Sequence, residues 1–175
     1  MAINLHAYNF YRFDDLTFLF TTEAGDEYQC YFISYADYFA SQPEIAPNFF
    51  SFNLKLISND GKPIRKGTDK RIADTVITIV GDFLGSKSNA VVYVCDNSDG
   101  KEGARARKFL SWFDFYDHPS SKIVQVTSNF NVGGLFIYSS LLIHKKNKRF
   151  NDMVFAYLEL TKDDFNKASW GVFLG

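Results

Sequence analysis

The chain has few cysteines, prolines and histidines, and almost no net charge. Two cysteines, three histidines and four prolines occur among 175 residues. No histidine is spaced from another histidine or from a cysteine as zinc ligands are, so the sequence does not favour a metal site. The formal net charge of −1 implies no bulk attraction to nucleic acid or to an anionic membrane.

Long hydrophobic runs are also missing. No uninterrupted apolar stretch approaches the roughly 18 residues that a membrane-spanning helix needs. The N-terminal segment lacks the basic start and the apolar core of a secretory signal. Cys30 and Cys95 each lie in an apolar, strand-like run. A disulfide between them stays open as an alternative, but two buried free thiols are the simpler interpretation. The sequence therefore predicts a soluble cytoplasmic protein without a membrane partner.

Aromatic residues, in contrast, are abundant. The chain contains 19 Phe and 10 Tyr, and aromatic residues make up 18 % of the sequence. Such side chains dominate the energetics of burial, so we expect a core that is rich in aromatic contacts. The length is close to the usual prior of one domain per ~150 residues, and no repeat or linker is visible. The sequence predicts one globular domain over residues 1–175.

Four strands are predicted in the first third of the chain, over residues 8–13, 16–22, 27–35 and 49–57. Gly25 lies between the second and third of these strands and can supply the positive φ of a tight turn. The last strand alternates most clearly, with Phe50, Phe52 and Leu54 on one face, as expected of a half-buried strand.

The remainder of the chain mixes helices and strands. A helix is predicted from a cap at Asp69 to an exit at Gly85, with Thr75 on its polar face, and a second helix over 103–116. Predicted strands cover residues 90–95, 122–129, 134–144 and 153–160. The first of these is continuously apolar, which indicates burial on both faces. A short helix capped by residues 161–164 follows. The prediction is therefore an α+β domain, ββββαβαβββ, with a mostly antiparallel mixed sheet and two main helices.

One crossover in this order points to a ligand site. Strand 49–57, the first helix and strand 90–95 form a βαβ unit, in which the two strands run parallel if they share a sheet. The loops that leave both strands then lie at one edge, where ligands of open sheets bind. The candidate anion-binding residues lie on these loops and at the starts of the following helices: Arg65, Lys66, Gly67, Lys70, Asp96, Asn97, Asp99, Gly100, Arg105, Arg107 and Lys108.

The chemistry expected there is the binding of an anion. A helix N-terminus contributes about 0.3–1 kcal/mol to anion binding, and a charge-assisted arginine bond about 1.5–3 kcal/mol. Phosphate alone would thus bind weakly, and a real ligand would need a further group to hold it. The alternative is that Arg105 and Arg107 pair with Asp96, Asp99 or Asp114 and only stabilise the loop. A further basic cluster over 145–149 gives only weak grounds for nucleic-acid binding.

Two resemblances accompany this pattern. The segment YVCDNSDGKEGARARKFLSWF, with the upstream segment DKRIADTVITIV, resembles the signature of an uncharacterised bacterial family, a domain of unknown function. Its signature positions here are Cys95, Asp96, Ser98, Asp99, Gly100, Arg105, Arg107, Phe109, Trp112 and Phe113. The resemblance spans most of the chain and implies no activity.

The second resemblance concerns the order of elements. The predicted order is similar to that of GNAT-type acetyltransferases: strands, a basic loop, a helix, a strand, a helix and closing strands. This resemblance implies that acetyl-CoA binds at the loop before the first of these helices. Arg65 and Gly67 occupy that loop, but their spacing departs from the Q/R-x-x-G-x-G/A pattern of that fold. The general acid of the fold is a Tyr on the later helix, where this chain has Phe109, and Tyr116 lies two turns on.

These observations favour a binding domain without catalysis. Its partner would be a protein or an anionic small molecule, and it would need no cofactor. The alternative is an acyl-CoA-dependent, GNAT-like N-acyltransferase that uses acetyl-CoA. The sequence leaves open whether the chain is an enzyme.

Overall fold

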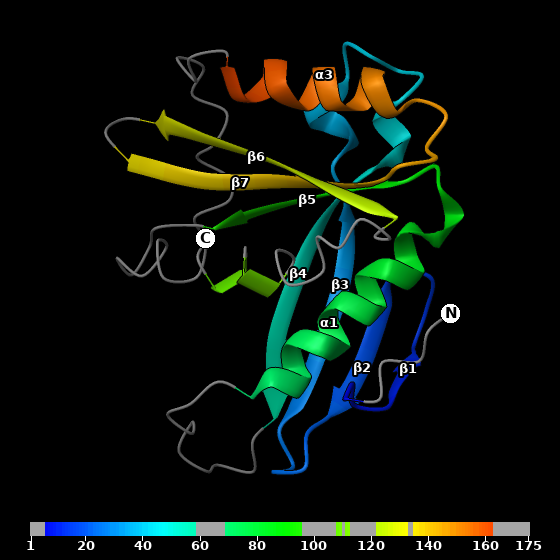
Figure 1. The fold of residues 1–175 in the computed structure, drawn as a ribbon, viewed down its shortest axis with the longest axis vertical. Helices are drawn as coiled ribbons and strands as arrows, with labels where there is room; N and C mark the ends of the chain where they lie inside the picture. Colours follow the sequence, from blue (N-terminus) through cyan, green and yellow to red (C-terminus); the bar gives the residue numbers. More distant parts are fainter. Residues whose placement is uncertain are drawn as a thin grey trace.

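The computed structural model describes residues 6–58, 69–95, 108–109, 111–112, 122–132 and 135–162. Seven strands form one mixed sheet in the order β1-β2-β3-β4-β5-β7-β6, flanked by two long helices, α1 and α3 (Figure 1). All neighbouring strands are antiparallel except β4 and β5. The predicted α+β class with a mostly antiparallel mixed sheet is confirmed.

The first four strands form an antiparallel meander: β1 (Phe10–Arg12), β2 (Thr17–Thr21), β3 (Glu27–Ser34) and β4 (Phe49–Ser58). Gly25 in the β2–β3 turn has a φ of 86°, a conformation that glycine adopts without steric cost. Two 3-10 helices, η1 (Ala36–Phe39) and η2 (Ala46–Asn48), connect β3 to β4. The four predicted strands are confirmed, with the first shortened to three residues.

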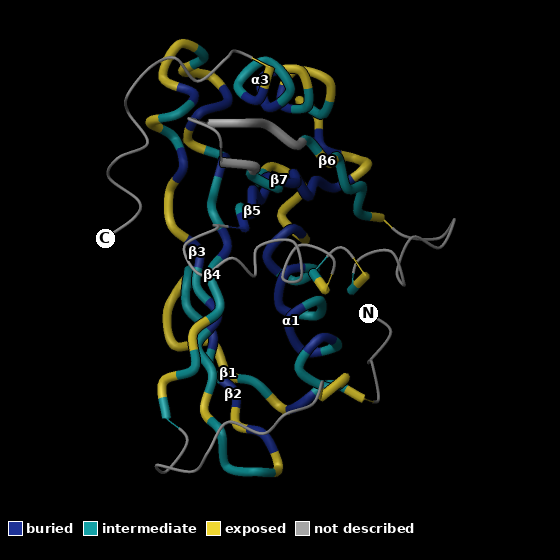
Figure 2. The backbone as a smooth tube through the Cα atoms, turned by 90° about the vertical axis from the view of Figure 1, so that its left-hand side faces the viewer, coloured by how far each residue is buried: buried dark blue, intermediate teal, exposed yellow. Residues whose placement is uncertain are grey.

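Helix α1 (Lys70–Phe83) covers one face of this meander (Figure 2). Its buried apolar side chains recur at helical spacing: Ala73, Val76, Ile79, Val80 and Phe83. Thr75, which the sequence places on the polar face, is fully buried. Its hydroxyl donates to the Arg71 carbonyl over 2.6 Å and accepts from the Tyr8 N–H over 2.8 Å. A threonine can enter the core here because both functions of its hydroxyl are satisfied.

The exit of α1 differs from the prediction in one detail. The helix passes into a 3-10 turn, η3 (Leu84–Ser86), which contains Gly85. The residue with left-handed backbone is Lys87, with a φ of 61°. Glycine would adopt this conformation more easily than lysine. The position of Gly85 in the sequence therefore does not reveal which residue has the left-handed backbone.

Strand β5 (Ala90–Cys95) is an interior strand of the sheet, between β4 and β7. Val91 and Tyr93 pack into the core beneath α1, whereas Ala90 and Val92 pack into a second core on the opposite face. The predicted burial on both faces is therefore confirmed. This strand joins the meander to the hairpin of β6 (Ile123–Val132) and β7 (Leu135–His144), whose strands were predicted with slightly different ends.

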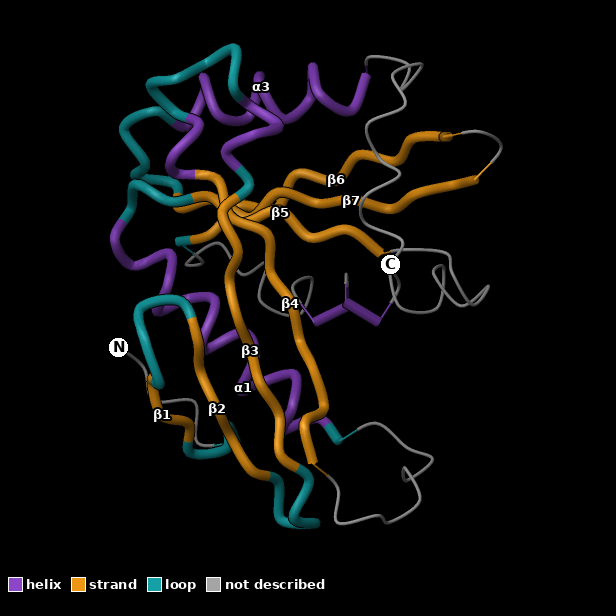
Figure 3. The backbone as a smooth tube through the Cα atoms, turned by 180° about the vertical axis from the view of Figure 1, so that it is seen from behind, coloured by secondary structure: helices purple, strands orange, loops and turns teal. Residues whose placement is uncertain are grey.

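Helix α3 (Phe150–Lys162) covers the face of β5, β7 and β6 that is opposite to α1 (Figure 2). Figure 3 shows it beside the connection between β3 and β4, and Phe39 of η1 shares its core. The same view shows β4 and β5 leaving their common start in different directions. The sheet is thus strongly twisted, with α1 on one face and α3 on the other.

The predicted strand over residues 153–160 is wrong, because these residues lie in α3. Met153, Ala156, Tyr157 and Thr161 are its buried residues, which is the spacing of one helical face. The apolar run MVFAYL conceals this period. The turn before the helix contains Asn147, whose side chain accepts the Arg149 N–H over 2.8 Å. This asparagine is the sequence signal that could have predicted the start of the helix.

Two further predictions fall partly outside the described residues. Within the predicted helix over 103–116, residues 108–109 and 111–112 are helical, and the other positions are not described. Thr161 lies in the last turn of α3 rather than capping a new helix, and its hydroxyl donates to the Tyr157 carbonyl over 3.0 Å. Residues 163–164 lie outside the described residues.

Candidate functional site

The parallel contact between β4 and β5 is short. Only three residue pairs lie opposite one another, from Phe49 and Ala90 to Ser51 and Val92. Both strands then continue, β4 to Ser58 and β5 to Cys95, and they run apart in Figure 1 as they do from behind in Figure 3. We call residues 52–58 of β4 and 93–95 of β5 the β4–β5 divergence. It lies at the carboxyl ends of the two parallel strands, where ligands of open sheets bind.

The start of α1 lies near the carboxyl end of β4 (Figure 1). Asp69 caps the helix as predicted, and its Oδ1 accepts the Arg71 N–H over 2.9 Å. Its other oxygen, Oδ2, accepts the Tyr8 hydroxyl over 2.6 Å. A carboxylate of the chain itself therefore already occupies part of the positive end of this helix.

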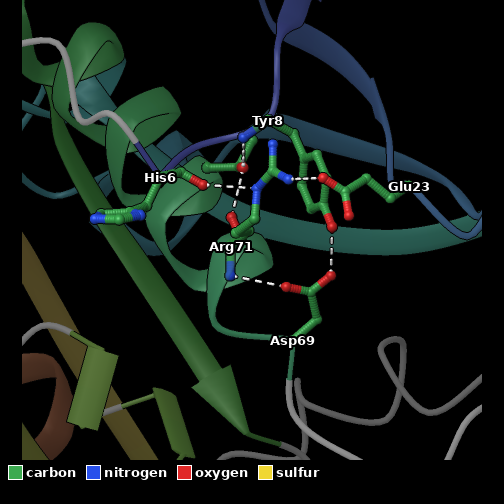
Figure 4. Close-up of polar contacts among 6 residues, drawn as sticks. His6, Tyr8, Glu23, Asp69 and Arg71 are labelled. Carbon is green, nitrogen blue, oxygen red and sulfur yellow. Dashed lines mark hydrogen bonds and ion pairs between the residues drawn. The ribbon is translucent and has the colours of Figure 1, made fainter.

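Arg71, which is not among the predicted site residues, is held in place by the same network (Figure 4). Its guanidinium donates to the His6 carbonyl over 3.0 Å and pairs with Glu23. The guanidinium carbon also lies 4.0 Å from the centroid of the Tyr8 ring. Arg71 consequently fastens the N-terminal segment to α1.

Burial raises the pKa of the Tyr8 hydroxyl, and the hydrogen bond to Asp69 raises it further. The hydroxyl therefore remains the donor in this bond at neutral pH. Asp69, Tyr8 and Arg71 thus form a structural network at the side of the β4–β5 divergence.

Two of the predicted site residues are described. Lys70 is the first residue of α1 and is exposed. Lys108 is also exposed, and its ammonium group lies 5.7 Å from the centroid of the Trp112 ring. The others lie outside the described residues: Arg65, Lys66, Gly67, Asp96, Asn97, Asp99, Gly100, Arg105 and Arg107. Whether the two basic clusters share one site therefore stays a prediction.

Phe109 links the two diverging strands. Its ring centroid lies 5.5 Å from that of Phe52 on β4 and 4.3 Å from that of Tyr93 on β5. The Trp112 ring packs against Phe109 in a tilted arrangement, with 5.1 Å between the ring centroids. Phe109 is thus a packing residue between β4 and β5.

A row of polar side chains crosses β5, β7 and β6 on the α1 side, and sequence reasoning did not identify it. Gln125 donates from Nε2 to the Tyr93 hydroxyl over 3.1 Å and to Ser140 Oγ over 3.3 Å. Ser140 also shares a hydrogen bond of 3.1 Å with Thr127. Alternation of polar and apolar residues in the segment VQVTS was the available signal. These groups lie beside Tyr93, so they could bind the polar part of a ligand that enters the divergence.

A buried hydroxyl pair lies on the opposite face. Tyr157 of α3 is completely buried and donates to Ser139 Oγ over 3.1 Å. Burial raises the pKa of Tyr157 far above its ordinary value. The phenol is therefore a neutral hydrogen-bond donor at physiological pH, and its role is to hold α3 against β7.

The cysteines are both free and buried, as predicted. Burial raises the pKa of Cys30 to about 12, so its thiol stays protonated and is not a nucleophile. Cys95 ends β5 and contributes to the core under α1. Neither residue is placed as a reactive thiol.

Within the described ranges, no group of three or more His, Cys, Asp or Glu side chains is arranged to hold a metal ion. His144, for example, is buried, and its Nδ1 accepts the Lys146 N–H over 2.9 Å. Across the same ranges, no helix has the length and apolar character needed to traverse a bilayer.

Comparison with known proteins gives the family. A family model described as a family of unknown function, DUF6169, matches residues 68–159, from just before α1 to near the end of α3. Searches of curated proteins and of solved structures returned no match. Because the family model covers more than half of the 175 residues, the chain belongs to DUF6169, a family of unknown function.

Proposed function

We propose that the chain binds an anionic small molecule between the diverging parts of β4 and β5. The observation that carries this proposal is the end of the parallel pairing at Ser51 and Val92, while both strands continue. Backbone N–H and C=O groups at such an edge need partners. A ligand with amide groups of its own could pair with them as an added strand does.

The segments that leave the two strands are basic, so the ligand should be negatively charged. Lys70 begins α1 and Lys108 lies in the helical segment after β5, and both are exposed. Arg65, Lys66, Arg105 and Arg107 precede these lysines in the sequence. Cations grouped in these segments favour a negatively charged group, such as a phosphate.

An acyl-CoA is the second, more specific candidate. Around the divergence, the chain forms a strand, a crossover helix and a parallel strand, followed by an antiparallel pair. The similarity of this order to the GNAT-type order favours an acyl-CoA as the ligand. CoA combines phosphates with an extended arm that carries two amides, which suits a charged loop beside an open strand edge. Phe109 packs in the core, so the proposal is binding, and transfer of the acyl group is a separate question.

A thermal-unfolding panel tests this proposal. The chain is heated with CoA, acetyl-CoA, nucleotides and phosphate, and a ligand that binds the folded state raises the melting temperature with its concentration. We expect CoA or a related phosphorylated compound to stabilise the chain, and Arg65→Ala to abolish the effect. Lys162→Ala is the matched control, because Lys162 is exposed on α3 and pairs with Glu159.

The outcomes separate three readings. Stabilisation by CoA without consumption of acetyl-CoA in the presence of amines would support binding alone. Consumption of acetyl-CoA would support the N-acyltransferase alternative. No stabilisation by any of these compounds would refute the small-molecule proposal and favour a protein as the partner.

A further inference from the structure

A second site lies at the opposite end of β5. Because Ala90 pairs with Ile143, the turn that enters β5 lies beside the turn that leaves β7. These two turns and η2 surround a pocket of about 450 Å³. That volume is within the range of small-molecule sites, and the pocket is separate from the β4–β5 divergence at the carboxyl end of the strand.

The lining of this pocket is strongly basic. Lys87, Lys146, Lys148 and Arg149 contribute to it, and none of the described lining residues is an acid. Arg149 is neutralised, since it pairs with Glu44 at 2.9 Å and with Asp152 at 2.6 Å. The ammonium groups of the three lysines make no ion pair with any residue that the structure describes. The pocket therefore carries an uncompensated positive charge.

The position of these lysines is fixed by the backbone. Asn147 is buried, and its Nδ2 donates to the Ser88 carbonyl over 3.1 Å, which ties the two turns together. His144 accepts the N–H of Lys146. Lys87 has left-handed backbone with a φ of 61°, a conformation that is costly for a residue with a Cβ and that recurs at functional positions. The lysines are thus held around one space by two connected turns.

The other lining residues indicate what a ligand could contact. Ile45 and Met153 lie almost wholly buried beneath the pocket, while Ser86, Ser88 and Asn48 provide polar groups in its lining. Lysine ammonium groups bind phosphate as point charges. We propose that this pocket binds a small phosphorylated molecule, with its phosphate at the three lysines.

Calorimetric titration with pyrophosphate, AMP and adenosine tests the proposal. We expect pyrophosphate and AMP to bind and adenosine not to bind. Tighter binding of AMP than of pyrophosphate would show that the organic part contributes. Lys146→Ala combined with Lys148→Ala should weaken binding by about tenfold or more, as expected when charge-assisted hydrogen bonds are lost.

Two variants keep this result interpretable. Lys145→Ala removes the same charge from the same turn, but Lys145 does not line the pocket, so binding should change less than about twofold. Lys87→Gly removes a charge at a position where glycine suits the backbone. It should weaken pyrophosphate binding by about tenfold while the melting temperature stays the same or rises.

The proposal is overturned if the wild-type chain binds neither pyrophosphate nor AMP. The single variant Lys146→Ala is compared with Lys145→Ala, and equal weakening of binding by the two would also overturn the proposal, because the effect would then be diffuse electrostatics. Pyrophosphate binding measured by calorimetry should weaken in Lys87→Gly and stay unchanged in Arg65→Ala, whereas protection of the β4 and β5 amides by CoA should be lost in Arg65→Ala and kept in Lys87→Gly. The failure of either site can therefore be distinguished from the failure of the other.

Discussion

The hydroxyl of Tyr8 lies 2.6 Å from Oδ2 of Asp69, the residue that also caps α1. One carboxylate therefore links the N-terminal segment to the start of the crossover helix. The same carboxylate accepts hydrogen bonds from the Tyr8 hydroxyl and from the Arg71 N–H.

Tyr8→Phe should lower the free energy of unfolding by about 0.5–1.5 kcal/mol, because it removes one hydrogen bond and leaves the ring in place. Asp69→Ala removes the helix cap as well and should cost about 1–2 kcal/mol. Urea unfolding of both single variants and of the double variant gives their coupling energy. Additive effects would show that the two residues do not interact in solution.

Thr75→Val should lower the free energy of unfolding, although threonine and valine have nearly the same shape. The hydroxyl is fully buried and serves both the Tyr8 N–H and the Arg71 carbonyl, so valine leaves a buried donor without its partner. The expected loss is about 1–3 kcal/mol in urea unfolding. Thr75→Ser retains the hydroxyl and is the control. A valine variant as stable as the serine variant would contradict the proposed role of the hydroxyl.

The buried thiol of Cys30 should make the folded protein less stable in alkali. Burial raises the pKa of its thiol from 9.0 to about 12, so the folded chain keeps a proton that the unfolded chain releases. The free energy of unfolding should therefore fall as the pH rises from about 9 to about 12. Chemical unfolding over this range measures the slope, and Cys30→Ala should reduce it. An unchanged slope in that variant would assign the effect to other groups, such as Tyr35 and Tyr157, whose pKa values burial also raises.

The buried imidazole of His144 should make the folded protein less stable in acid. Burial lowers the pKa of its imidazole, and Lys87, Lys122 and Lys146 lower it further. The unfolded chain then binds a proton near pH 6.5 that the folded chain does not, so stability should fall as the pH drops below that value. NMR titration of the imidazole should give a pKa below 6.5, and His144→Asn should flatten the stability profile. A midpoint above 6.5 would contradict this environment.

The sequence predicted the parts of the fold that local patterns determine. Alternation in β4, the unbroken apolar run of β5 and the cap at Asp69 each follow from rules that act over a few residues. The parallel relation of β4 and β5 followed from the crossover helix between them. Free, buried cysteines followed from their apolar surroundings.

The elements that were missed depend on tertiary contacts. Residues 153–160 are helical because Met153, Ala156 and Tyr157 face one core, and a run of apolar residues does not reveal which period applies. Thr75 enters the core only because the distant Tyr8 provides a donor. Likewise, the proximity of Lys87 to Lys146 depends on the antiparallel pairing of β5 with β7, which no local pattern specifies.

Hydrogen exchange of the backbone amides, with and without CoA, tests the central claim most directly. We predict that CoA slows exchange in residues 52–58 of β4 and 93–95 of β5, because the ligand would pair with the strand edges beyond Ser51 and Val92. Exchange in β1 and β2 should stay unchanged. If CoA leaves the amides of β4 and β5 unprotected, or protects only the turns around Lys87 and Lys146, the β4–β5 divergence is not its binding site.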